Sequence, residues 1–222
     1  MRTSKRFAVP LSAAALLGGA AFVVLPGAPG ATDPRPVATT RAEYKLDGKG
    51  SRLTVETETV GLSSMFGHDH KFVARDLAGK ITLVPGTADA ATLEMTVRGD
   101  ALNLVEDVSD DTHREIETAL REAVLETGKF PEIAFRSRAV TATKNDDGSF
   151  DIKMTGDLTL HGVRRKMIVP AHVTMTSEGS LRAVGALELR QSDFKIKPYT
   201  FAKGTVRVRD YVALSFDLVA RR

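Results

Sequence analysis

The stretch DIKMTGDLTLHGVRRKMIVPAHVTM, residues 151–175, indicates the fold of this protein more directly than any other part of the chain. In its first ten residues the apolar positions and one glycine fall on one face, and charged residues or threonines take the other. Because successive side chains of a β-strand point to opposite faces, this alternation predicts a half-buried strand. The apolar set is Ile152, Met154, Gly156, Leu158 and Leu160.

A second strand is predicted directly after the first. His161-Gly162 is a turn signal, and beyond it Val169, Ala171, Val173 and Met175 again share one face. Two alternating runs separated by a short glycine-containing turn indicate an antiparallel hairpin.

The same alternation extends outward over most of the chain from Tyr44, and turn signals such as Pro85-Gly86, Asp146-Asp147-Gly148 and Glu178-Gly179 separate the runs. Short gaps favour an up-and-down order, and about eight strands are expected, a number whose closed barrel can hold one small ligand. The expected fold is all-β with one helix, an eight-stranded antiparallel up-and-down barrel. Further alternating runs lie in residues 51–60, 91–100, 131–140, 181–190 and 205–220.

One segment has a helical repeat instead. DDTHREIETALREAVLETGKFP, residues 110–131, places Ile116, Ala119, Leu120, Ala123 and Val124 on one face. A capping box is expected at Thr112 and Glu115, with an end at Gly128 before Pro131. The apolar face must be buried, and we expect the helix to cap one end of the barrel.

The N-terminal region has the order of a secretory signal. A basic start with Arg2, Lys5 and Arg6 precedes an apolar run and then small residues and prolines. We therefore predict a signal peptide over residues 1–30, a linker over 31–41 and a barrel domain over 42–220. The expected location is secreted or periplasmic in the cell envelope, with an uncleaved anchor as the alternative because the apolar run is long.

Composition excludes several classes of function. The predicted signal holds three of the 31 basic residues, which leaves 28 basic against 28 acidic residues, so we expect no nucleic-acid partner. There is no cysteine, hence no thiol nucleophile or thiolate metal site. The sequence also has no Gly-x-Ser-x-Gly elbow and no phosphate loop, and we expect neither enzymatic activity nor a cofactor.

FGHDHKF, residues 66–72, is the most distinctive candidate site. In an extended chain Phe66, His68, His70 and Phe72 share one face, which the two phenylalanines direct towards the interior. The histidines could contact the polar end of a ligand, or bond neighbouring strands. They could also hold a metal, but a transition metal needs three or four ligands, and no third can be assigned.

The other candidate lining residues are inward-facing apolar side chains that could equally be packed core. Methionines suit a flexible ligand, and Ala74, Gly156, Ala183 and Gly185 would leave space among them. The complete ligand-binding prediction is Phe66, His68, His70, Phe72, Met95, Phe135, Met154, Leu158 and Phe216.

The remaining histidines have simpler interpretations. We expect His161 to fix a turn, His172 to face water and His113 to be exposed in the first helical turn.

Several motifs together resemble the YceI-like family. MTGDLTLHGVRRKMIVPAHV, residues 154–173, is similar to its central signature, and GKFPEIAFRS, residues 128–137, to its helix-to-strand passage. LRQSDFKI, residues 189–196, resembles an Arg-x-Asp-Phe-Gly-Ile run with Lys195 in place of glycine. The Gly-His-Asp-His block at residues 67–70 resembles a variant branch of that family, and the resemblance covers roughly residues 42–220.

The resemblance implies a lipocalin-like barrel that binds a polyisoprenoid, a polyprenyl quinone or another long-chain amphiphile such as a fatty amide. The expected partner is such a lipid, with transient contact to a membrane surface and a monomer or homodimer as the oligomeric state. One alternative is a metal-binding or redox-associated periplasmic protein that uses the His-x-His pair. Another is a filled barrel that acts as an interaction module.

Overall fold

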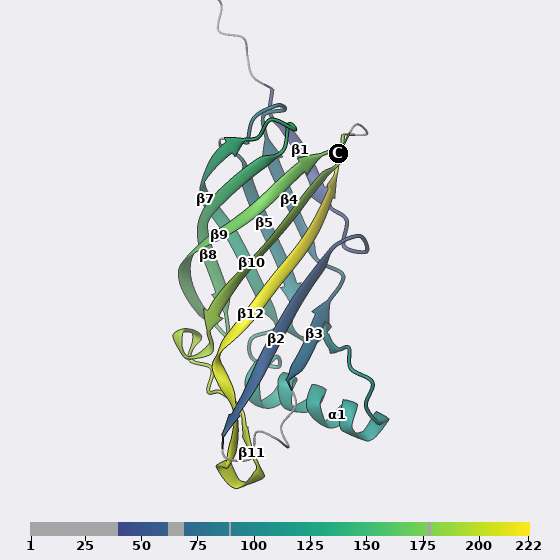
Figure 1. Ribbon diagram of the computed structural model, residues 1–222, viewed down its shortest axis with the longest axis vertical. Helices are drawn as coiled ribbons and strands as arrows, with labels where there is room; N and C mark the ends of the chain where they lie inside the picture. The colour runs from purple at the N-terminus through teal and green to yellow at the C-terminus, as the bar shows by residue number, and fades with distance from the viewer. Residues whose placement is uncertain (1–39, 62–68, 89, 177–178) are drawn as a thin grey trace, which may run out of the picture. The chain divides into compact units, whose positions relative to one another are not determined.

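The computed structural model describes residues 40–61, 69–88, 90–176 and 179–222. Its strands form an antiparallel barrel in the order β1-β4-β5-β7-β8-β9-β10-β12, and β12 also pairs with β1 and so closes the ring (Figure 1). The strands are β1 (Ala42–Leu46), β2 (Arg52–Gly61), β3 (His70–Ala74), β4 (Ala78–Leu83), β5 (Thr92–Arg98), β6 (Leu102–Leu104), β7 (Glu132–Lys144), β8 (Phe150–Leu160), β9 (Val163–Met175), β10 (Leu181–Arg190), β11 (Thr200–Phe201) and β12 (Val206–Arg221).

Three of the barrel's long strands are interrupted near the same level, which is why the eight barrel strands carry more than eight labels. β1 pairs with β4 and β2 pairs with β3, so β1 and β2 are the two halves of one strand, and β3 and β4 are the two halves of the next. β5 and β6, which pair with β4 and β3, are the halves of a third. In the first break, Asp47 accepts a hydrogen bond from the Gly50 backbone N–H at 3.0 Å and turns the chain. The prediction of a closed eight-stranded antiparallel barrel is confirmed, and the described residues contain one α-helix, as predicted.

The hairpin of β8 and β9 is paired along its whole length, from Phe150 opposite Val173 to Leu160 opposite Val163. Its turn is His161-Gly162, and both residues have positive φ, 51° and 70°. Two left-handed residues match the twist of the flanking strands in a two-residue hairpin, so the predicted turn is confirmed.

Helix α1 (Asp110–Ala119) crosses one end of the barrel, away from the end where the C-terminus lies (Figure 1). Ile116 and Leu120 pack against the core, as predicted, whereas Ala123 is exposed. The predicted capping box is wrong, because the N-cap is Ser109, whose Oγ accepts the Thr112 N–H at 3.3 Å.

The end of the helix also differs from the prediction. α1 continues into a π-helical turn, Leu120–Val124, and the chain then leaves through Glu126 at φ 45°, before Gly128. Short 3₁₀ segments occupy Gly99–Ala101, Gln191–Phe194 (η4) and Ala202–Gly204. In the described parts of the chain, no helix has the length and apolar character needed to span a bilayer.

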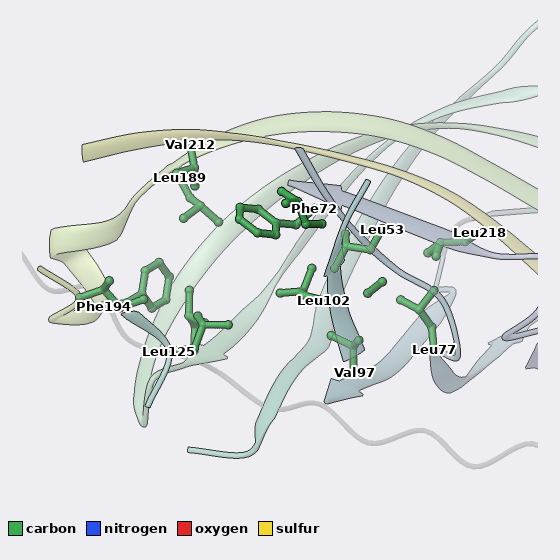
Figure 2. Close-up of a cluster of buried hydrophobic side chains, with 14 residues drawn as sticks. Leu53, Phe72, Leu77, Val97, Leu102, Leu125, Leu189, Phe194, Val212 and Leu218 are labelled. Carbon is green, nitrogen blue, oxygen red and sulfur yellow. The ribbon is translucent and has the colours of Figure 1, made fainter. Parts of the chain in front are cut away.

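The main core lies between the barrel wall and the helical end. Figure 2 shows Phe72 of β3 and Leu189 of β10 directed into one cluster with Leu125 and Phe194. Phe194, only 1% exposed, belongs to the LRQSDFKI motif. The motif that carried part of the family resemblance therefore closes the barrel beneath α1.

Candidate functional site

The barrel interior contains an apolar cavity of about 130 Å³. Among the described residues its lining is apolar except for Thr92. Five residues of the predicted site come together here, from the four strands β5, β7, β8 and β12: Met95, Phe135, Met154, Leu158 and Phe216.

A second void of about 100 Å³ lies nearer the helical end. Phe72 lines it, together with Leu120 and Val124 of the helical segment, and Thr57 and Gln191 supply its polar groups. The two voids share part of their lining, so side chains rather than backbone separate them. The shared residues are Leu53, Ile133, Leu158, Leu189 and Leu214.

The small inward residues do not create the space that the sequence suggested. A Cβ on Gly156 would lie 2.5 Å from Cζ of Phe135, and one on Gly185 would lie 2.4 Å from Cζ of Phe216. Each glycine is therefore covered by an aromatic ring from the adjacent strand, and Ala74 is fully buried. That prediction was wrong at Gly156 and Gly185, whereas Ala183 does line the larger void.

His70 lies on the same side of β3 as Phe72, with the two rings 6.2 Å apart. Its Nδ1 is 3.1 Å from Oε2 of Glu106, while Oε1 of Glu106 accepts the Lys71 N–H at 2.7 Å. His70 is absent from the lining of both voids. The ligand-binding role of His70 remains a prediction, and Phe66 and His68 lie outside the described residues.

The other histidines also have local partners. His161 is held between the Phe194 carbonyl oxygen, 3.2 Å from Nδ1, and the Glu126 carboxylate, 2.8 Å from Nε2. His172 is exposed beside Asp151, as predicted for its outward position. His113 departs from the prediction, since its Nε2 lies 3.2 Å from the Leu104 carbonyl oxygen. Within the described ranges, no group of three His, Asp or Glu side chains is placed to hold a metal ion.

Among the described residues no charged side chain is buried, and several form cross-strand pairs on the outside of the wall. Arg182 on β10 bonds both carboxylate oxygens of Asp217 on β12, at 2.8 and 2.7 Å, and this lowers the pKa of Asp217. Arg138 similarly lowers the pKa of Asp157 across β7 and β8. The interior therefore offers apolar surface, and charge is kept at the outer face.

Sequence reasoning missed the contribution of Gln191. This side chain is 5% exposed, lines the smaller void and donates from Nε2 to the Arg209 carbonyl oxygen at 2.8 Å. The signal was present in LRQSDFKI, but the run was interpreted as a family motif rather than as part of the lining.

Two solved structures have a similar fold. Burkholderia cenocepacia BcnA superimposes with a TM-score of 0.58 at 18% identity, covering 78% of this chain and 98% of that one. A polyisoprenoid binding domain from Saccharophagus degradans gives a TM-score of 0.58 at 13% identity, covering 80% and 97%.

Sequence comparison identifies the family. A UPF0312 protein of Shewanella denitrificans is 29% identical over 170 residues, which is 73% of this chain and 81% of that protein. The model of the YceI-like domain matches residues 44–220. That match covers most of the chain and coincides with the described barrel, and the protein therefore belongs to the YceI-like family.

Proposed function

We propose that this protein binds one long-chain apolar ligand of the polyisoprenoid class inside its barrel. The observation that carries the proposal is the pair of apolar voids separated only by side chains. Burial of hydrocarbon contributes about 0.8 kcal/mol per CH₂, so a long chain needs few polar contacts. The polyisoprenoid binding domain of similar fold supports this ligand class.

The proposed binding includes a rearrangement of side chains, because both voids are small. A cavity of about 150 Å³ accepts a benzene molecule, and the larger void here is about 130 Å³. A long chain therefore has to displace the five shared side chains and join the two voids. Leucine and isoleucine can change rotamer, which makes a single continuous channel accessible without a change in strand pairing.

The polar end of the ligand is assigned to the helical end of the barrel. Thr57 and Gln191 are the polar members of the smaller void's described lining, and His70 lies next to Phe72 at the same end. The variant His-x-His sequence at residues 68–70 would then set headgroup preference. Secretion or a periplasmic location completes the proposal and rests on the signal-like sequence of residues 1–30.

Native mass spectrometry of gently purified protein tests this function. We expect a co-purifying lipid mass, or uptake of added geranylgeraniol at one molecule per chain. Ala183→Phe, which fills the larger void, should abolish it, while Ala186→Phe on the exposed face of the same strand should not. Failure of the unmodified protein to retain or take up any isoprenoid would overturn the proposal.

A further inference from the structure

The barrel wall has a seam between β9 and β10. The two strands pair only from Leu181 opposite Met175 to Val184 opposite His172. β9 extends from there back to Val163, and β10 extends on to Arg190, yet no pairs join residues 163–171 to residues 185–190 among the described residues. Figure 1 shows the two strands diverging towards the helical end.

The sequence explains where the pairing stops. Continuation of the register would place Pro170 opposite Ala186, and proline has no N–H to donate to a ladder. Pro170 is still in close contact with β10, because a Cβ on Gly185 would lie 2.3 Å from the Pro170 carbonyl oxygen. Beyond this contact both strands keep their pairing on the other edge, with β8 and β12, and leave the edges that face each other unpaired.

The seam adjoins the larger void. Met167 and Val169 on β9 and Leu187 on β10 point inward and line that void from the two sides of the seam. All three are partly exposed, as are Met95 and Met154 on the paired wall of the same void.

The outer lips of the seam carry both apolar and charged residues, with Ile168 between Lys166 and Pro170 on β9 and Ala186 next to Glu188 on β10. Ile168 is 62% exposed, and Val184 at the last paired position is 44% exposed. At the lower end the Arg165 side chain reaches across, and its Nε donates to the Asp193 carbonyl oxygen at 2.9 Å. The unpaired stretch therefore lies between the β9–β10 ladder at one end and the exposed hydrogen bond from Arg165 to Asp193 at the other.

We propose that the seam between β9 and β10 is the lateral portal through which the hydrocarbon chain of the ligand enters and leaves the barrel. The inference rests on the proposed function. Ile168 and Pro170 on the outer lip lead to Val169 and Leu187 on the inner face, so a hydrocarbon chain has an apolar path beside the exposed charges of Lys166 and Glu188. At one described end Leu125 and Phe194 are buried in the main core, and at the other Ala88 clusters with Phe150.

Cross-linking the seam tests the portal, and the chain has no native cysteine to interfere. Ile168→Cys with Glu188→Cys places two exposed thiols on opposite lips, to be joined by a short bis-maleimide. The matched control is His172→Cys with Val184→Cys, which lie opposite each other in the existing ladder. Each variant capped with N-ethylmaleimide is the unlinked reference, and uptake of a dansyl-labelled geranylgeranyl chain is followed by stopped flow.

We expect the seam cross-link to slow both uptake and release at least about tenfold, as for a closed gate, with no loss in the control. Equal uptake rates in the linked and capped seam variants would overturn the portal while leaving the binding function intact. If the unmodified protein takes up no probe, the binding function fails and the portal with it. Should the first pair not fold, Lys166→Cys with Arg190→Cys provides a second link across the seam.

Discussion

The hairpins on the two sides of β9 differ in their pairing, although they share a strand. β8 and β9 pair without interruption over the full length of the shorter strand, whereas β9 and β10 pair at four positions and then separate. The same residues of β9 are thus secured on one edge and unpaired on the other. A barrel can therefore be closed, with every strand beside two others, and still have one place where two strands can move apart without breaking backbone hydrogen bonds.

The largest expected difference between the two regions is in packing. Phe135 covers Gly156 on the paired side and is 6% exposed, so Phe135→Ala should lower the free energy of unfolding by about 3–5 kcal/mol. Val184→Ala on the lip of the seam removes a half-exposed side chain and should cost less than about 1 kcal/mol. Urea unfolding of both variants measures the contrast, and similar losses would contradict it.

Hydrogen exchange tests the seam itself. Amides of β10 that point towards β12 are in a ladder, whereas those of residues 185–190 that point towards β9 have no ladder partner among the described residues. We expect alternate amides in this stretch to exchange about 100-fold faster than their neighbours or more. Uniform protection along β10 would mean that the seam is paired in solution.

A smaller effect is expected just beyond the seam. Lys195 has φ 60°, in the left-handed region, immediately after η4, whose Asp193 carbonyl accepts the Arg165 bond. Lys195→Gly should raise the free energy of unfolding by about 1 kcal/mol, because a side chain is disfavoured in this conformation. Lys197→Gly is the control, with no gain expected. A loss of stability in Lys195→Gly, measured by thermal unfolding, would show that the lysine has another role.

The smallest effect concerns the turn of the fully paired hairpin. Hydrogen bonds from Lys129 and then His161 lower the pKa of Glu126. A carboxyl whose pKa is lower in the folded state stabilises the protein above its unfolded pKa, and that contribution is lost as the pH falls through its folded pKa. Glu126→Gln should therefore weaken the acid dependence of stability below about pH 4, the ordinary range of glutamate. Exposed Glu122→Gln should not, and equal acid profiles for wild type and Glu126→Gln would contradict this assignment.

The sequence was sufficient to predict the barrel because period-two alternation survives in every long strand. It predicted the His161-Gly162 turn and the helical segment for the same reason, since local chemistry decides both. The broken strands were not predicted, because the breaks depend on contacts such as Asp47 with Gly50 and on register between distant segments. β4, residues 78–83, was missed because only Ile81 and Leu83 alternate on one face, which is a weak pattern.

Prediction of the site was limited by a different cause. Alternation identifies which residues face inward, and Met95, Phe135, Met154, Leu158 and Phe216 do meet around one void. Alternation does not show how the volumes of the inward-facing side chains fit together. Counting small residues suggested space at Gly156 and Gly185, whereas the neighbouring rings occupy it.

The two aromatic rings that cover the two glycines also mean that the interior volume of the barrel can change without a change in its strands. Phe135 on β7 lies over Gly156 of β8, and Phe216 on β12 lies over Gly185 of β10. Each ring has room only because the residue that it covers is a glycine. How much the interior can hold is therefore governed by two aromatic side chains rather than by strand number. A lineage could exchange them for smaller residues and acquire a longer or bulkier ligand while every strand, turn and ladder stayed in place.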